Sequence, residues 1–135
     1  MSVGVLLITH DDIGTSLVDS LQKMLGNSLP LPVKVLPIRL DSDPLSFCYH
    51  VENLYLTLNQ GQGVLVLTDL FGATPCNIAS SLINNYRVRV VAGVNFPMLI
   101  KIMNYPNADL DTLASRAMSG GCQGVLDVNN VLNNN

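Results

Sequence analysis

Basic, aromatic and cysteine residues are all scarce in this chain of 135 residues. It has 7 Lys and Arg against 10 Asp and Glu, so its net charge is -3, and it contains no Trp. Nucleic acid is therefore not expected as the main ligand, because its phosphates are bound by clustered Lys and Arg. Cys48, Cys76 and Cys122 lie far apart and form no C-x-x-C pair. This spacing predicts reduced thiols in a cytoplasmic protein, with neither a disulfide framework nor a metal site.

Long apolar runs are also missing. No segment approaches the roughly 18 unbroken apolar residues of a membrane span, and the N-terminus lacks the pattern of a signal peptide. We therefore expect no direct insertion into a membrane. Hydrophobic residues nevertheless make up 48% of the chain and charged residues only 13%. Such a composition predicts a dense core and apolar surface that a partner or a second copy covers.

Strand and helix patterns alternate along the chain. Strands are expected over 3–9, 33–40, 63–69, 88–93 and 124–128, and helices over 15–25, 45–58, 76–84, 97–104 and 110–118. This order predicts an α/β fold with an open, mostly parallel β-sheet and helices on both faces. Pro37 places the second strand near a sheet edge, and Gly120-Gly121 is expected to break the chain. We predict one domain over 1–128, followed by an Asn-rich, frayed tail over 129–135.

Two chemically competent side chains stand where predicted parallel strands end. His10 closes the first apolar run and Asp69 closes the third. Ligands bind outside the carboxyl ends of the strands in open α/β sheets, so the two side chains can meet there. A carboxylate beside an imidazole fixes its tautomer and orientation and stabilises the protonated or modified ring. The alternative is that Asp69 only caps the turn into the next helix.

The loop after Asp69 carries a pattern that suits an anion. Gly72 permits unusual backbone angles and the close approach of a ligand. The backbone N–H groups of Ala73 and Thr74, and the Thr74 hydroxyl, would then face the same sheet edge, where a helix N-terminus favours phosphate. An ordinary capped loop would have the same sequence, so the prediction of Gly72, Ala73 and Thr74 as phosphate-binding residues depends on their place beside His10.

Together these residues predict a histidine that carries a phosphoryl group. A neutral imidazole nitrogen is a competent nucleophile, and phosphoryl transfer needs mainly alignment and charge stabilisation. The sequence contains neither a P-loop nor a G-x-G-x-x-G motif. We therefore expect no cofactor, and we expect the phosphoryl group to come from one protein and to pass to another.

Three motifs extend this reading to nearly the whole chain: Thr9-His10, TDLFGATPCN over 68–77, and AGVNFPML over 92–99. In this order they resemble the enzyme IIA domain of the mannose family of the bacterial phosphoenolpyruvate:sugar phosphotransferase system. The resemblance implies a cytoplasmic phosphotransferase of sugar transport. In that family the histidine corresponding to His10 accepts phosphate from the phosphocarrier protein HPr and passes it to a IIB partner, while Asp69 orients the ring and Thr74 serves as the loop hydroxyl.

The resemblance also implies a homodimer in which a C-terminal strand, 124–128 here, is exchanged between subunits. The chain departs from the family at Asp11-Asp12, where glycine commonly follows the histidine, and at Ala73, where the loop has its second glycine. Inward-facing acids would repel phosphate, so we expect Asp11 and Asp12 to face solvent or to cap the next helix. Arg39 and the other basic residues form no run and are expected to be solvated.

Two other functions remain open. A two-component receiver domain is also a parallel α/β fold, and Asp11, Asp12, Asp69 and Lys101 could supply its acidic pocket and its lysine, with Asp69 as the phosphorylated residue. That reading leaves His10 without a role. The second alternative is a non-catalytic regulatory relative that keeps the fold without phosphoryl transfer.

Overall fold

The computed structural model describes residues 1–41 and 43–134. Its four strands are β1 (Gly4–His10), β2 (Val33–Ile38), β3 (Val64–Thr68) and β4 (Val88–Ala92), and its helices are α1 (Ile13–Leu25), α2 (Pro44–Leu58), α3 (Thr74–Ser80), α4 (Phe96–Met103), α5 (Leu110–Gln123) and α6 (Val128–Asn133). Within this described part, no helix is both long and apolar enough to cross a bilayer.

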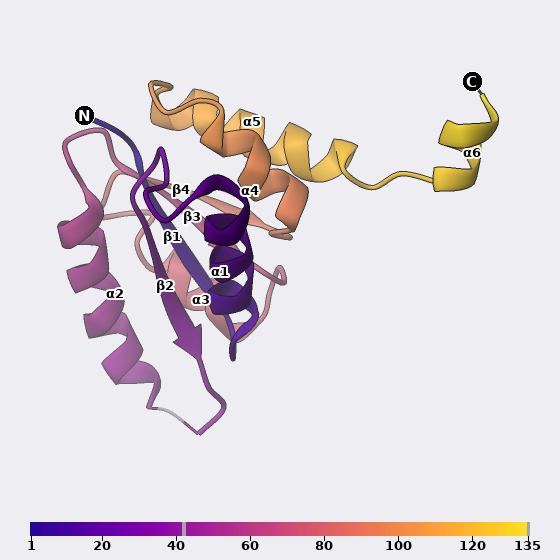
Figure 1. The fold of residues 1–135 in the computed structure, drawn as a ribbon. Coiled ribbons are helices and arrows are strands. Elements are labelled where there is room, and N and C mark those ends of the chain that lie inside the picture. The colour runs from indigo at the N-terminus through magenta and orange to yellow at the C-terminus, as the bar shows by residue number, and fades with distance from the viewer. Residues whose placement is uncertain (42, 135) are drawn as a thin grey trace.

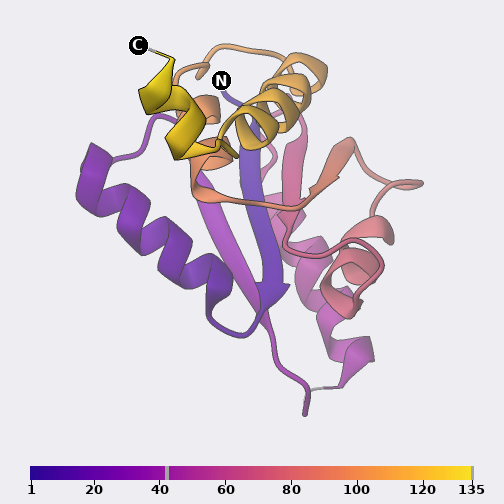
Figure 2. The ribbon, with the colours of Figure 1, turned by 90° about the vertical axis from the view of Figure 1, so that its right-hand side faces the viewer.

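The four strands form one sheet in the order β2-β1-β3-β4, and every pairing is parallel (Figure 1). Helices cover both faces, as the two views together show (Figure 2). The predicted α/β class is therefore confirmed. β2 lies at a sheet edge, as Pro37 predicts, since a residue without an N–H group is tolerated best there.

β1 lies in the middle of the sheet, and this position explains why its sequence is almost wholly apolar. Val5 and Leu7 face a core shared with α1, α4 and α5. Leu6 and Ile8, which alternate with them, face a second core formed with α2 and α3. All four side chains are fully buried, and each stabilises the fold by about 1.5–3 kcal/mol relative to an exposed position. This central anchoring fixes the position of His10 at the end of the strand.

The expected break at Gly120-Gly121 is wrong, because both residues lie inside α5. The absence of side chains there permits close packing against α4, most clearly at Gly120. A Cβ atom on Gly120 would lie 2.5 Å from the Cβ of Lys101, and one on Gly121 would lie 2.9 Å from the Met98 Cε. The tertiary contact thus overrides the weak helix propensity of glycine.

The expected strand over 124–128 is absent from the described residues. Residues 124–127 have no regular structure, and α6 follows, with the Asp127 side chain accepting a hydrogen bond from Asn130 N. A five-residue strand needs a neighbouring strand for its hydrogen bonds, and the single chain offers none at this place. The helix also replaces most of the predicted frayed tail, whose last residue, Asn135, lies outside the described residues. Exchange of this segment in a dimer stays a prediction.

Candidate functional site

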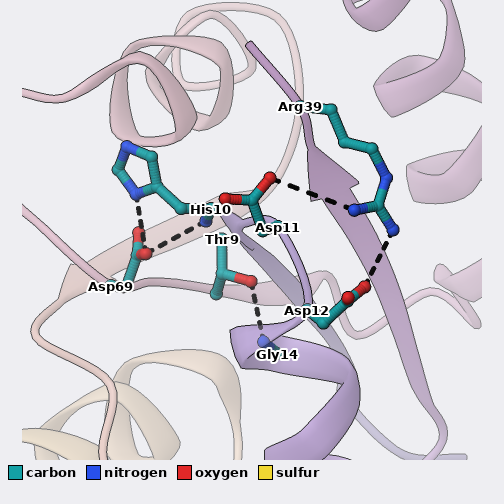
Figure 3. A network of polar contacts seen from close by, with 7 residues as sticks. All are labelled: Thr9, His10, Asp11, Asp12, Gly14, Arg39 and Asp69. Carbon is teal, nitrogen blue, oxygen red and sulfur yellow. Dashed lines mark hydrogen bonds and ion pairs between the residues drawn. The ribbon is translucent and has the colours of Figure 1, made fainter.

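His10 and Asp69 meet at the carboxyl edge of the sheet. His10 is the last residue of β1, and Asp69 directly follows β3, the strand beside it. Ile8 and Thr68 are the last residues that β1 and β3 pair with each other, so the chain segments that follow them, with His10 on one and Asp69 on the other, continue side by side. Asp69 Oδ2 accepts a hydrogen bond of 3.0 Å from the backbone N–H of His10, and it lies 2.8 Å from His10 Nδ1 (Figure 3). The predicted pair is thus assembled from two separate strands.

The charge of this pair follows from its hydrogen bonds. Burial would raise the pKa of the Asp69 carboxyl, but the backbone and side-chain hydrogen bonds from His10 outweigh it and leave that pKa below its usual value. An ionised carboxylate can only accept hydrogen bonds, so the proton between the groups lies on Nδ1 of His10. In the neutral ring Nε2 then carries the lone pair, and it points away from Asp69 (Figure 3). About a third of the His10 side chain is exposed.

Two buried side-chain oxygens at this edge have no hydrogen-bond partner among the described residues: Thr68 Oγ1 and Asp69 Oδ1. Leaving a buried polar atom unsatisfied costs roughly 1–3 kcal/mol, so such atoms are rare in folded proteins and concentrate at functional sites. Asp69 therefore keeps free acceptor capacity on one oxygen while the other holds His10. In the described part of the chain, no group of three or more His, Cys, Asp or Glu side chains could hold a metal ion.

The loop between Asp69 and α3 has the backbone that its sequence predicts. Gly72 has a φ of +83°, in the left-handed region that favours glycine. Ala73 N donates to Leu70 O at 3.3 Å, so this amide is engaged in closing a turn. Thr74 begins α3 and is exposed. Among the described residues, the three predicted phosphate-binding residues make no hydrogen bond with His10 or Asp69.

Thr9 fixes the turn that leads from His10 into α1. Its side chain is fully buried, and its Oγ1 accepts a hydrogen bond of 2.8 Å from Gly14 N. Asp12, the residue before α1, makes no capping hydrogen bond with its side chain. The cap thus comes from the strand and holds the start of α1 against the end of β1. Sequence reasoning assigned no role to Thr9.

Asp11 and Asp12 face solvent, as expected, and both are paired with Arg39. Arg39 Nη2 donates to Asp12 Oδ1 at 2.8 Å, and Arg39 Nη1 lies 3.9 Å from Asp11 Oδ1 (Figure 3). Asp11 has a φ of +43°, the left-handed region, at the position where glycine was expected from the resemblance. Arg39 was missed as part of the site because its place depends on β2 lying next to β1, which the sequence pattern does not fix.

Comparison with known proteins identifies relatives of this chain. The family model EIIA-man, described as "PTS system fructose IIA component", matches residues 4–118. A protein of Escherichia coli strain K12 named as a phosphotransferase enzyme IIA component, YadI, is 31% identical over 104 residues, which cover 75% of this chain and 68% of that protein.

Two further relatives carry mannose in their names. The mannose-specific EIIAB component of Escherichia coli strain K12 is 37% identical over 71 residues, which cover 50% of this chain and only 22% of that longer protein. The mannose/sorbose specific IIA subunit from Enterococcus faecalis superimposes with a TM-score of 0.82 at 26% identity, covering 94% of this chain and 95% of that one. The whole fold described above therefore recurs in a IIA subunit.

Proposed function

The chain belongs to the EIIA-man family of phosphotransferase-system IIA components, and from that premise we propose that it carries a phosphoryl group on His10. The observation that carries the proposal is the contact between His10 and Asp69. It holds a protonated Nδ1 against an ionised carboxylate at 2.8 Å and leaves Nε2 as the nucleophilic atom.

In the proposed step, the lone pair of His10 Nε2 forms a bond to the phosphorus atom of the donor. The bond between phosphorus and the donor atom that carried it breaks, and its electron pair stays on that donor atom. His10 becomes a phosphoramidate whose Nδ1 keeps its proton, so the positive charge that develops on the ring faces Asp69. The carboxylate thereby stabilises both the transition state and the phosphorylated ring. In the second transfer an acceptor atom forms a bond to phosphorus, the bond from phosphorus to Nε2 breaks, and its electron pair returns to the neutral imidazole.

Gly72, Ala73 and Thr74 are proposed to line the space around the phosphoryl oxygens. The left-handed backbone at Gly72 and the exposed hydroxyl of Thr74 support this placement. Because the Ala73 amide already donates to Leu70 O, the hydroxyl of Thr74 is the more useful donor in this loop. The role of the loop is thus to position and neutralise the group, while His10 performs the covalent chemistry.

The donor and the acceptor are proposed from family membership. HPr would supply the phosphoryl group, and a separate IIB protein would receive it, or the phosphorylated form would serve regulation. Sugar transport and a cytoplasmic location follow from these partners. We also propose a homodimer without cofactor, nucleic acid or direct membrane insertion. The exposed apolar side chains of the C-terminal segment, Val125, Leu126, Val128 and Leu132, support a second copy.

Reconstituted phosphoryl transfer tests the proposal directly. Incubation with phosphoenolpyruvate, enzyme I and HPr should add the mass of one phosphoryl group to the chain. With radiolabelled phosphoenolpyruvate, the label on the chain should be acid-labile and stable in base, as expected of a phosphoramidate. The variant His10→Gln should take no label, while His50→Gln, which changes the exposed histidine of α2, should be labelled normally. If the His10→Gln variant were labelled as well as His50→Gln, His10 would not be the acceptor.

The same experiment separates the two alternatives. A receiver-like domain would form an acyl phosphate on Asp69, would need Mg²⁺, and would keep its label in His10→Gln. This alternative is less well supported because Asp69 is engaged by His10, while Asp11 and Asp12 are paired with Arg39. A non-catalytic relative would gain no mass at all when all the other components are active.

A further inference from the structure

Negative charge is concentrated in the connections at the carboxyl edge of the sheet, the edge at which β1 ends in His10. The four connections that follow the strands, 11–12, 39–43, 69–73 and 93–95, contain five Asp and one Arg, a net charge of -4, although the whole chain carries only -3. A phosphoryl group that approaches Nε2 carries up to two negative charges. The site therefore needs a means of limiting repulsion, and Arg39 is the one basic residue in these connections.

Arg39 is held against the acids nearest to the histidine. It donates to Asp12 at 2.8 Å and lies 3.9 Å from Asp11, the residue bonded to His10 (Figure 3). The backbone reinforces this link, since Asp11 N donates to Ile38 O at 3.0 Å, directly before Arg39. The side chains of Arg39, Asp11 and Asp12 are each about half exposed or more. Such pairs add little to stability, so a role in stability alone does not explain the arrangement.

We propose that Arg39 is a positioning residue for phosphoryl transfer at His10: by neutralising Asp11 and holding Asp12, it lowers the electrostatic barrier to an incoming phosphorylated protein. This inference rests on the proposed function and adds a residue to it. Consecutive Cα atoms are about 3.8 Å apart, so Asp11 lies next to His10 in the chain. Its charge is therefore close enough to the reacting group to escape full screening at physiological ionic strength, where the Debye length is about 8 Å. In Figure 3, Arg39 lies across both carboxylates from the ring of His10.

The rate of transfer from phosphorylated HPr to the chain provides the test. In Arg39→Gln, the rate constant should fall by roughly 3- to 10-fold at an ionic strength of about 0.01 M, where the Debye length is about 30 Å. At about 1 M, where that length is about 3 Å, the variant and the parent should react at nearly equal rates. Arg39→Lys should keep most of the parent rate, since it keeps the charge.

Two further variants separate electrostatics from damage to the fold. Combining Arg39→Gln with Asp11→Asn and Asp12→Asn should restore the rate, because the uncompensated acids are then gone. Arg89→Gln is the matched control: Arg89 donates to Asp111 at 2.8 Å, is 48% exposed, compared with 49% for Arg39, and lies on β4 outside the four connections. It should leave the rate unchanged at every ionic strength.

Three outcomes would overturn the inference. They are an Arg39→Gln rate equal to that of the parent at low ionic strength, a faster rate, or a defect that is the same at all salt concentrations. A parent chain that takes no label would instead refute the proposed function, so the two failures are distinguishable. A labelled parent with a fully active Arg39→Gln variant would remove only Arg39 from the mechanism.

Discussion

The Nδ1 atom of His10 lies 2.8 Å from Oδ2 of Asp69, although 59 positions of sequence separate the two residues. In the proposed transfer Asp69 would have two functions: it would accept the ring N–H, and it would carry the charge opposite the positive charge that develops on the ring. An amide in its place would keep the size of the side chain but lose the charge. The pair therefore offers a direct measure of how much the carboxylate contributes to the proposed transfer.

We expect Asp69→Asn to slow phosphorylation of His10 while the fold persists. A hydrogen bond to a charged group contributes about 1.5–3 kcal/mol, which corresponds to about 10- to 150-fold in rate if it is fully expressed in the transition state. Single-turnover transfer from phosphorylated HPr measures the change, and the circular dichroism spectrum and melting temperature check the fold. Unchanged transfer kinetics would remove Asp69 from the mechanism.

The same carboxylate predicts how stability depends on pH. Although burial opposes it, the hydrogen bonds from His10 lower the pKa of Asp69 from its ordinary value of 3.8. The unfolded chain therefore binds this proton at a higher pH than the folded chain does. The contribution of Asp69 is fully present above that ordinary value and is lost as the pH falls through the lower folded pKa.

Urea unfolding of the parent and of Asp69→Asn, from neutral pH down to the acid limit of folding, measures this contribution. The free energy of unfolding of the parent should fall more steeply than that of the variant as the pH drops below 3.8. The other carboxyl groups are common to both proteins, so the difference between the two curves reports Asp69. Parallel curves would contradict the lowered pKa.

Much of the fold and the pairing of His10 with Asp69 were predictable, because each depends on local sequence and one general rule. The apolar runs before His10 and Asp69 have the length and composition of buried parallel strands, and the carboxyl ends of such strands share one edge. The two side chains meet there as predicted. The left-handed backbone at Gly72 was predictable for the same local reason.

The features that were missed depend on which elements become neighbours. Arg39 could not be paired with Asp12 until the sheet order placed β2 beside β1. Gly120 was interpreted as a chain break because the low helix propensity of glycine is visible in sequence, whereas its contact with Lys101 is not. A strand over 124–128 was expected from its pattern, but a strand forms only where another strand can accept its hydrogen bonds.

The turn after His10 should be sensitive to small changes in Thr9 and Gly14. Thr9→Val keeps the shape but leaves the Gly14 N–H buried without its acceptor, which should cost about 1–3 kcal/mol. In Gly14→Ala the new Cβ would lie 2.8 Å from Thr9 Oγ1 and 3.1 Å from Val35 Cγ1, so we expect a loss of about 1–3 kcal/mol through overpacking.

Chemical denaturation measures both changes, with Thr15→Val as the control. Thr15 lies on the same helix, next to Gly14, but its side chain is exposed, so its replacement should alter the free energy of unfolding by less than about 0.5 kcal/mol. A Thr9→Val variant as stable as the parent would mean that the capping hydrogen bond contributes nothing to the position of α1.

The C-terminal segment predicts the oligomeric state. Helix α6 stands away from the body of the protein (Figure 1), and Val125, Leu126 and Val128 are 77%, 65% and 61% exposed. Burial of such side chains against a second copy would be favourable. We therefore expect light scattering to give twice the chain mass of 14.6 kDa for the parent, and the single mass for a chain truncated after Gln123.

A point variant separates the role of the apolar side chains from that of chain length. Leu126→Asp should weaken the dimer, because it would bury a charge in the interface without a partner. Leu56→Asp changes an equally prominent residue on α2, 60% exposed, and should leave the mass unchanged. A parent that remains a monomer at all measurable concentrations would refute the proposed homodimer and leave the phosphoryl-carrier proposal untouched.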